Sequence, residues 1–232
     1  MAGKICGVVT GRTSAEAGKL LEKISGAGAD AAELRIDFLK KPSAENAAKL
    51  VKKAKRLGLE TIVTCRPGWE GGKFRGSEGE RKKILLKNAE SKPDFIDVEL
   101  ESGKEFDEVV AEAKRRGVKV IVSFHDFGKT PSPKELEKIL AREFKRGAAI
   151  GKVACQVNSA NDAVALLELL QRARKKGKKI IAIGMGEKSR PVRVLAALLG
   201  SEYSFARADE KGSAEGQLSV SQMVELTRVG GK

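Results

Sequence analysis

Two residues whose types could carry out chemistry stand out in this 232-residue chain: its only histidine, and a lysine placed in an apolar run. His125 follows the β-branched run 118–124, and Lys152 lies inside the apolar run 148–155. Runs of this kind are typical of parallel strands that are buried on both faces. An amine that can attack a carbonyl, close to an imidazole that can carry protons, indicates covalent amine catalysis with a proton shuttle.

Other polar residues follow the ends of further apolar runs. In the run 33–37, period-two alternation places Glu33, Arg35 and Asp37 on one face. The remaining candidates stand at or beyond later strand ends: Arg66, Glu70, Asp97, Glu99, Met185, Arg193, Ser213 and Gln217. From the residues alone, structural interpretations stay open, because paired charges can brace an interior and a lysine can extend its amine past a strand end.

The elements that must position these residues alternate regularly along the chain. Apolar runs predict strands at 5–10, 31–37, 60–66, 95–100, 118–124, 150–157, 179–185 and 203–206. Amphipathic stretches predict helices at 14–25, 43–57, 78–89, 104–116, 132–146, 161–176, 192–199 and 220–228, and glycines 58, 117, 147 and 177 stand where helices must end. Eight strand–helix units without a dinucleotide-binding glycine loop predict an α/β protein, a (β/α)8 TIM barrel forming a single domain over residues 1–232. In such a barrel, the residues after the strands build the active face.

Composition narrows the function classes. The net charge of +14 raises the alternative of nucleic-acid binding, but the Lys and Arg residues cluster near helix ends and the chain has one Trp and one Tyr. We therefore expect solvated helix faces, with an excess charge that can attract an anionic substrate. No run is long and apolar enough for a membrane span, and no signal segment precedes the first strand, so we expect a cytoplasmic protein. The three cysteines lack metal-ligand spacing and are expected to be reduced core residues; we predict no metal and no cofactor.

Taken in order, these motifs resemble the type I 3-dehydroquinate dehydratase family over nearly the whole chain. The matching segments are Glu33-Leu34-Arg35-Ile36-Asp37, Arg66 with Glu70-Gly71-Gly72, Asp97-Val98-Glu99, Ser123-Phe124-His125-Asp126, Gly151-Lys152, Met185, Arg193, and Ser213 with Gly216-Gln217. The resemblance implies a barrel, usually a homodimer, that removes water from 3-dehydroquinate in the shikimate pathway to give 3-dehydroshikimate.

The resemblance also implies a role for each residue. Lys152 would form the imine, His125 would be the general base and acid, and Glu70 would orient the imidazole. Arg193 would clamp the substrate carboxylate, since a guanidinium binds a carboxylate through two hydrogen bonds. The other predicted substrate-binding residues are Glu33, Arg35, Arg66, Met185, Ser213 and Gln217, the last two as part of a lid. At least one of Asp97 and Glu99 is expected to be the buried partner of a cation.

Two positions depart from the family pattern, and one rival activity remains. Phe124 stands where many relatives carry a small or polar residue, and Val8 stands where some present a serine, so no substrate contact is assigned to Val8. A class I aldolase or transaldolase would use the same lysine but would usually need a phosphate site after the seventh and eighth strands. Glu215 in that region disfavours a phosphate.

Overall fold

The computed structural model describes residues 2–209 and 216–228. Within these residues, parallel strands form one eight-stranded sheet in the order β7-β6-β5-β4-β3-β2-β1-β8. The strands are β1 (Lys4–Val9), β2 (Ala31–Arg35), β3 (Glu60–Thr64), β4 (Phe95–Glu99), β5 (Lys119–Asp126), β6 (Ile150–Gln156), β7 (Ile180–Met185) and β8 (Tyr203–Arg207). The prediction of a (β/α)8 barrel is confirmed.

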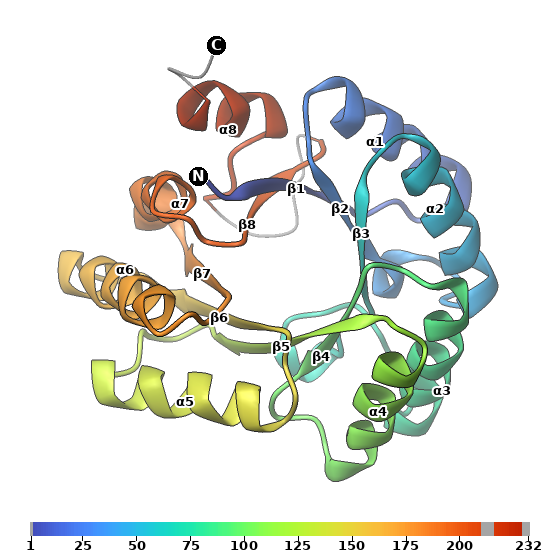
Figure 1. Ribbon diagram of the computed structural model, residues 1–232. Helices are drawn as coiled ribbons and strands as arrows, with labels where there is room; N and C mark the ends of the chain where they lie inside the picture. Colours follow the sequence, from blue (N-terminus) through green and yellow to red (C-terminus); the bar gives the residue numbers. More distant parts are fainter. Residues whose placement is uncertain (1, 210–215, 229–232) are drawn as a thin grey trace.

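Helices follow the strands and surround the sheet, as Figure 1 shows. They are α1 (Ser14–Gly26), α2 (Ala44–Arg56), α3 (Glu78–Asn88), α4 (Asp107–Arg115), α5 (Pro133–Lys145), α6 (Ala160–Lys175), α7 (Arg190–Leu198) and α8 (Val220–Thr227). Short 3-10 turns join some units: η1 (Ile36–Phe38), η2 (Gly68–Glu70), η3 (Ala89–Ser91), η4 (Lys104–Phe106) and η5 (Glu187–Ser189). The predicted helix-ending glycines 58, 117, 147 and 177 all have positive φ, between 68° and 104°, which a side chain would disfavour.

The ring of strands is nearly closed between β7 and β8, the two ends of the strand order (Figure 1). The amide of Glu202, just before β8, donates to the Ile180 carbonyl at 2.9 Å. The amide of Ala182 in β7 donates to Ser201 Oγ at 3.2 Å. Side-chain and main-chain contacts at the start of β8 therefore take the place of a regular ladder at this junction.

Two apolar layers hold the barrel together. A large outer layer lies between the sheet and the helices, and a smaller inner one fills the barrel with residues such as Ile62, Ile121 and Ile181. The three cysteines are buried and free, as expected. This alternation of outward and inward side chains along each strand is what directs the polar residues of the inner face toward one centre.

Several predicted boundaries were wrong by a few residues. The strand predicted at 31–37 ends at Arg35 because 36–38 turn into η1, and the strand predicted at 60–66 ends at Thr64. The strand predicted at 118–124 instead continues to Asp126, so His125 lies within β5 and not after it. The helix predicted at 192–199 begins at Arg190, which makes Arg193 its fourth residue.

Candidate active site

A pocket opens at the carboxyl ends of the strands, inside the ring, with about 550 Å³ of free space that is partly open to solvent. Its lining includes nine of the ten residues predicted for the site. These are Glu33, Arg35, Arg66, Glu70, His125, Lys152, Met185, Arg193 and Gln217. The tenth, Ser213, lies outside the described residues. The barrel thus brings together side chains from strands and loops spread over most of the chain.

Lys152 of β6 lines this pocket and is 3% exposed. Its Nζ lies 3.3 Å from Asp97 Oδ2 and 3.6 Å from Glu33 Oε1. The same atom stands 4.3 Å from the centre of the Phe205 ring. The amine is therefore in contact with two carboxylates and with an aromatic face.

Asp97 and Glu99 project from β4 toward Arg66, which follows β3. The guanidinium contacts Asp97 Oδ1 at 2.9 Å and Glu99 Oε1 at 2.7 Å, and donates to Ser123 Oγ at 2.8 Å. Burial opposes ionisation, but the charges of Arg66 and Lys152 outweigh it and lower the pKa of Asp97. The expectation that at least one of these acids pairs with a buried cation is confirmed for both.

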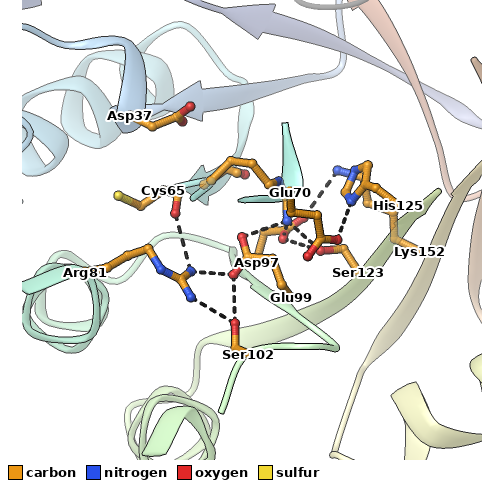
Figure 2. Close-up of polar contacts among 12 residues, drawn as sticks. Asp37, Cys65, Glu70, Arg81, Asp97, Glu99, Ser102, Ser123, His125 and Lys152 are labelled. Carbon is orange, nitrogen blue, oxygen red and sulfur yellow. Dashed lines mark hydrogen bonds and ion pairs between the residues drawn. The ribbon is translucent and has the colours of Figure 1, made fainter. Parts of the chain in front are cut away.

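His125 and Glu70 form a hydrogen-bonded pair at the pocket wall, as Figure 2 shows. Glu70 Oε1 lies 2.8 Å from His125 Nδ1, which leaves Nε2 for proton transfer with a bound molecule. Burial raises the pKa of Glu70 to about 8. Burial, together with the charges of Arg66, Lys152 and Arg35, lowers the pKa of His125 well below its usual value. The imidazole is thus uncharged at neutral pH, with a hydrogen on one of its two nitrogens.

The glycines after Glu70 explain how its loop fits against the barrel. Gly71 ends η2 with φ at 75°. A Cβ at Gly72 would stand only 2.0 Å from the Arg66 carbonyl oxygen, so the two segments touch at a place where only glycine fits. This close contact holds Glu70 next to the strand-end residues.

Glu33 and Arg35 lie on the same face of β2, as the alternation predicted. Glu33 Oε1 accepts a hydrogen bond from Thr64 Oγ1 at 2.9 Å. Arg35 pairs with Asp37 through two hydrogen bonds of 3.0 and 2.8 Å, although Asp37 belongs to η1 and not to the strand. The pair fixes the Arg35 guanidinium at the rim of the pocket.

Arg193 is a buried cation of a different kind. Its side chain donates to Ser189 Oγ and to the Phe205 carbonyl, both at 3.4 Å. Among the described residues, no carboxylate lies within ion-pair distance of it. Burial lowers the pKa of Arg193 to about 10, so the guanidinium remains charged at neutral pH. A buried positive charge without an anionic partner favours an anionic ligand.

Two aromatic contacts and one ion pair of the site were missed from the sequence. Phe205 under Lys152 and Phe127 stacked on His125, with ring centres 6.0 Å apart, are ordinary apolar residues in sequence. Arg81 of α3, which pairs with Glu99, looked like one of many helical cations. Its spacing four residues before buried Leu85 was the available signal of a buried face.

In the part of the chain that the structure describes, no group of three or more His, Cys, Asp or Glu residues forms a metal site.

Comparison with known proteins finds relatives that carry the same enzyme name. The family model for type I 3-dehydroquinase matches residues 5–232. A 3-dehydroquinate dehydratase of Methanothermobacter thermautotrophicus is 39% identical over 217 residues, covering 94% of this chain and 92% of the relative. One from Methanosarcina acetivorans is 37% identical over 210 residues, covering 88% and 87%.

Solved structures agree with this assignment. The crystal structure of the type I 3-dehydroquinate dehydratase of Clostridium difficile, with covalently modified comenic acid, superposes with a TM-score of 0.89 at 28% identity, covering 98% of this chain and 92% of that one. The enzyme of Geobacillus kaustophilus gives a TM-score of 0.90 at 25% identity, covering 98% and 90%. The resemblance drawn from the motifs is confirmed: the chain belongs to the type I 3-dehydroquinase family.

Proposed function

We propose that this protein is a hydro-lyase that converts 3-dehydroquinate to 3-dehydroshikimate and water through an imine on Lys152. The observation that carries the mechanism is a buried amine in a pocket that also holds an imidazole paired with a carboxylate. Family membership favours this reaction over the aldolase or transaldolase alternative. The solved structure of a relative with covalently modified comenic acid is consistent with covalent chemistry in this family.

The first stage forms the imine. Unprotonated Lys152 Nζ adds to the ketone carbon, and the resulting carbinolamine loses water as the C–O bond breaks. Asp97 and Glu33, 3.3 and 3.6 Å from Nζ, are placed to balance the charge of the iminium nitrogen. The face of the Phe205 ring, 4.3 Å from Nζ, gives the same cation an apolar cover.

The second stage is the elimination. His125 Nε2 takes the proton next to the iminium carbon; the electron pair of that C–H bond forms a C=C bond while the C=N π pair moves onto nitrogen, which gives an enamine. The enamine then expels the β-hydroxyl group, which leaves as water with the proton returned by His125. Hydrolysis of the conjugated imine releases the product and restores the amine. Glu70, bonded to Nδ1, keeps the ring oriented throughout.

The remaining lining residues suit a hydroxylated carboxylate. Arg193 would bind the carboxylate, and Glu33, Arg35 and Arg66 would accept or donate hydrogen bonds to hydroxyls. Met185, which is buried in the pocket wall, would pack on the ring. Gln217 and Ser213 would close over the ligand, with Gln217 already hydrogen-bonded to the Phe205 carbonyl at 3.4 Å.

The test is reductive trapping. Purified protein is mixed with 3-dehydroquinate and borohydride, and peptides are mapped by mass spectrometry. We expect a reduced adduct on Lys152, no adduct and no turnover in Lys152→Ala, and normal behaviour in Lys179→Ala, which removes an exposed lysine at the start of the next strand. Full turnover in Lys152→Ala, or an adduct on another lysine, contradicts the proposal.

A further inference from the structure

Arg81 is a buried arginine that does not line the active-site pocket. It belongs to α3, is 0% exposed, and its guanidinium stands 4.1 Å from the centre of the Phe106 ring. One nitrogen pairs with Glu99 Oε2, and another donates to Ser102 Oγ at 2.9 Å and to Glu78 Oε2 at 2.5 Å. Since it is absent from the pocket lining, any effect on chemistry must pass through another residue.

The contacts of Glu99 and Asp97 connect Arg81 to the amine of Lys152. Each oxygen of Glu99 has its own arginine: Oε2 has Arg81 and Oε1 has Arg66, at 2.7 Å. Each oxygen of Asp97 likewise has its own cation: Oδ1 has Arg66 at 2.9 Å, and Oδ2 has Lys152 at 3.3 Å. Charges of opposite sign thus alternate from α3 to β6, and Figure 2 labels four members of this row: Arg81, Glu99, Asp97 and Lys152.

The row has a consequence for Lys152. All five side chains are 0–4% exposed, so water cannot replace a missing partner. Without Arg81, Glu99 Oε2 would keep only the neutral Ser102 hydroxyl, at 3.1 Å, and Arg66 would be the one cation left to Glu99 in this row. We expect Arg66 then to turn toward Glu99 and loosen its hold on Asp97. Asp97 would then bind the lysine more tightly and favour the ammonium form, which cannot attack a ketone.

We infer that Arg81 is a positioning residue for imine formation: by pairing with Glu99 it keeps Arg66 on Asp97, and so leaves Lys152 free to lose its proton. This inference rests on the proposed imine mechanism. Substitutions at Arg81 replace none of the other ionisable groups around the amine. These come from β1, β2, η2, β5, α7 and, behind β6, α5: Cys6, Glu33, Arg35, Glu70, His125, Arg193 and Glu143.

The test measures the rate of borohydride-trapped imine formation with 3-dehydroquinate as a function of pH. In Arg81→Met we expect this rate to fall about tenfold near neutral pH, the size typical of coupled buried charges, and its acidic limb to move to higher pH. The direction follows because losing a positive charge, and gaining a tighter Asp97 contact, both favour the protonated amine. Arg81→Lys, which keeps the charge, should restore most of the rate and return the limb toward its original position.

Two further variants separate this role from simple stability. Phe106→Leu removes the ring that packs on Arg81 but leaves every charge, so it should lower the melting temperature without moving the acidic limb. In Arg81→Met with Glu99→Gln, the neutral amide no longer requires a second cation, and the limb should return toward that of the parent protein. The double variant leaves no buried carboxylate without a cation at this position, because Glu78, the other acid that pairs with Arg81, is 39% exposed and can be hydrated. It therefore tests the idea even if Arg81→Met alone does not fold.

The outcomes are distinct. If the parent protein forms no adduct, the proposed function fails before Arg81 is tested. If the parent forms the adduct but folded Arg81→Met keeps the same acidic limb, the inference is overturned. It is also overturned if Phe106→Leu moves the limb as far as Arg81→Met does, or if the folded double variant keeps a displaced limb.

Discussion

His125 and Glu70 share a buried contact in which the two pKa shifts have different origins. Burial raises the pKa of Glu70 to about 8, whereas burial and nearby cations lower the pKa of His125. The carboxyl therefore holds a proton up to about pH 8 and can donate it to Nδ1, which leaves hydrogen on Nε2. Once the carboxyl is ionised, Nδ1 carries the hydrogen and Nε2 can accept a proton from the substrate. The pair titrates as a unit.

This predicts the pH dependence of the reaction. In the parent protein, kcat/KM should rise as the pH increases through about 8, because loss of the Glu70 proton produces the basic form of the pair. In Glu70→Gln this rise of kcat/KM with pH should disappear, and kcat should fall by roughly 10- to 100-fold, since the amide cannot stabilise an imidazolium. Steady-state rates from pH 6 to 9 provide the measurement. The same rise of kcat/KM with pH in the folded variant would show that another group controls the pH dependence.

Removal of the imidazole should separate the two stages of the proposed reaction. In His125→Ala the amine of Lys152 is still present, so imine formation should continue slowly while elimination is nearly lost. With 3-dehydroquinate and no borohydride, intact-protein mass spectrometry should then find an imine on the protein that accumulates because it is not converted to product. Unimpaired dehydration by His125→Ala would remove the residue from the role of base.

Arg193 makes a prediction about binding. Its buried guanidinium has only two neutral hydrogen-bond partners of 3.4 Å among the described residues, so a substrate carboxylate would supply its charge partner. Arg193→Ala should weaken substrate binding roughly 10- to 100-fold, the value of a charged hydrogen bond, with a smaller change in kcat. Titration calorimetry with a carboxylate-containing product analogue checks this. Equal affinity in the variant would place the clamp elsewhere.

At the scale of the elements, the contact of α5 with β6 contains a buried acid that the proposed reaction does not use. Glu143 is 0% exposed, and among the residues that the structure describes neither of its carboxyl oxygens has a hydrogen-bond partner. A Cβ at Gly151 would come within 2.5 Å of Glu143 Oε2, so the glycine before Lys152 provides the space for this acid. Burial raises the pKa of Glu143 well above its ordinary value.

The shift predicts a pH-dependent stability. The unfolded chain releases this proton near pH 4.5, but the folded protein keeps it to much higher pH, so unfolding releases a proton in between and stability falls as pH rises. Glu143→Gln removes that effect and should raise the free energy of unfolding by about 1–3 kcal/mol at pH 8, with little difference at pH 4. Denaturant unfolding at both pH values tests it. Glu137→Gln, on the exposed face of α5, should show no comparable gain.

At the scale of the whole molecule, the net charge of +14 bears on how an anionic substrate arrives. A positive field raises the local concentration of anions, and salt screens it. We expect kcat/KM to fall a few-fold from low to high ionic strength, while kcat stays nearly constant. Rates in a series of sodium chloride concentrations test this. A flat kcat/KM would mean that the surface charge has no part in substrate capture.

Other expectations at this scale stay predictions. In the described chain, no helix is long and apolar enough to cross a membrane. The cytoplasmic location, the homodimer, the single domain over 1–232 and the lack of nucleic-acid binding still need experiments. Sedimentation and a binding assay with duplex DNA at moderate salt address two of them, since nucleic-acid binding predicts strong, salt-dependent affinity that survives Lys152→Ala.

The sequence by itself determined the barrel, because eight apolar runs alternate with amphipathic stretches and glycines mark the helix ends. It also determined which face of each strand carries chemistry, since alternation along β2 and β4 places Glu33 and Arg35, and Asp97 and Glu99, toward the inside. The family motifs then indicated Lys152 and His125 as the reacting groups. These features depend on residues close together in the chain, where period and local conformation are sufficient.

Only the tertiary structure decided which acid pairs with which base. The partners in the row from Arg81 to Lys152 come from α3, β4, β6 and the loop after β3, and their contacts depend on how far each strand is shifted relative to the next. Arg81 itself lies in a helix rich in cations, and composition cannot tell a solvated cation from one that contacts a buried acid. Distances between side chains that are far apart in sequence are set by packing of the whole barrel, which no local pattern records.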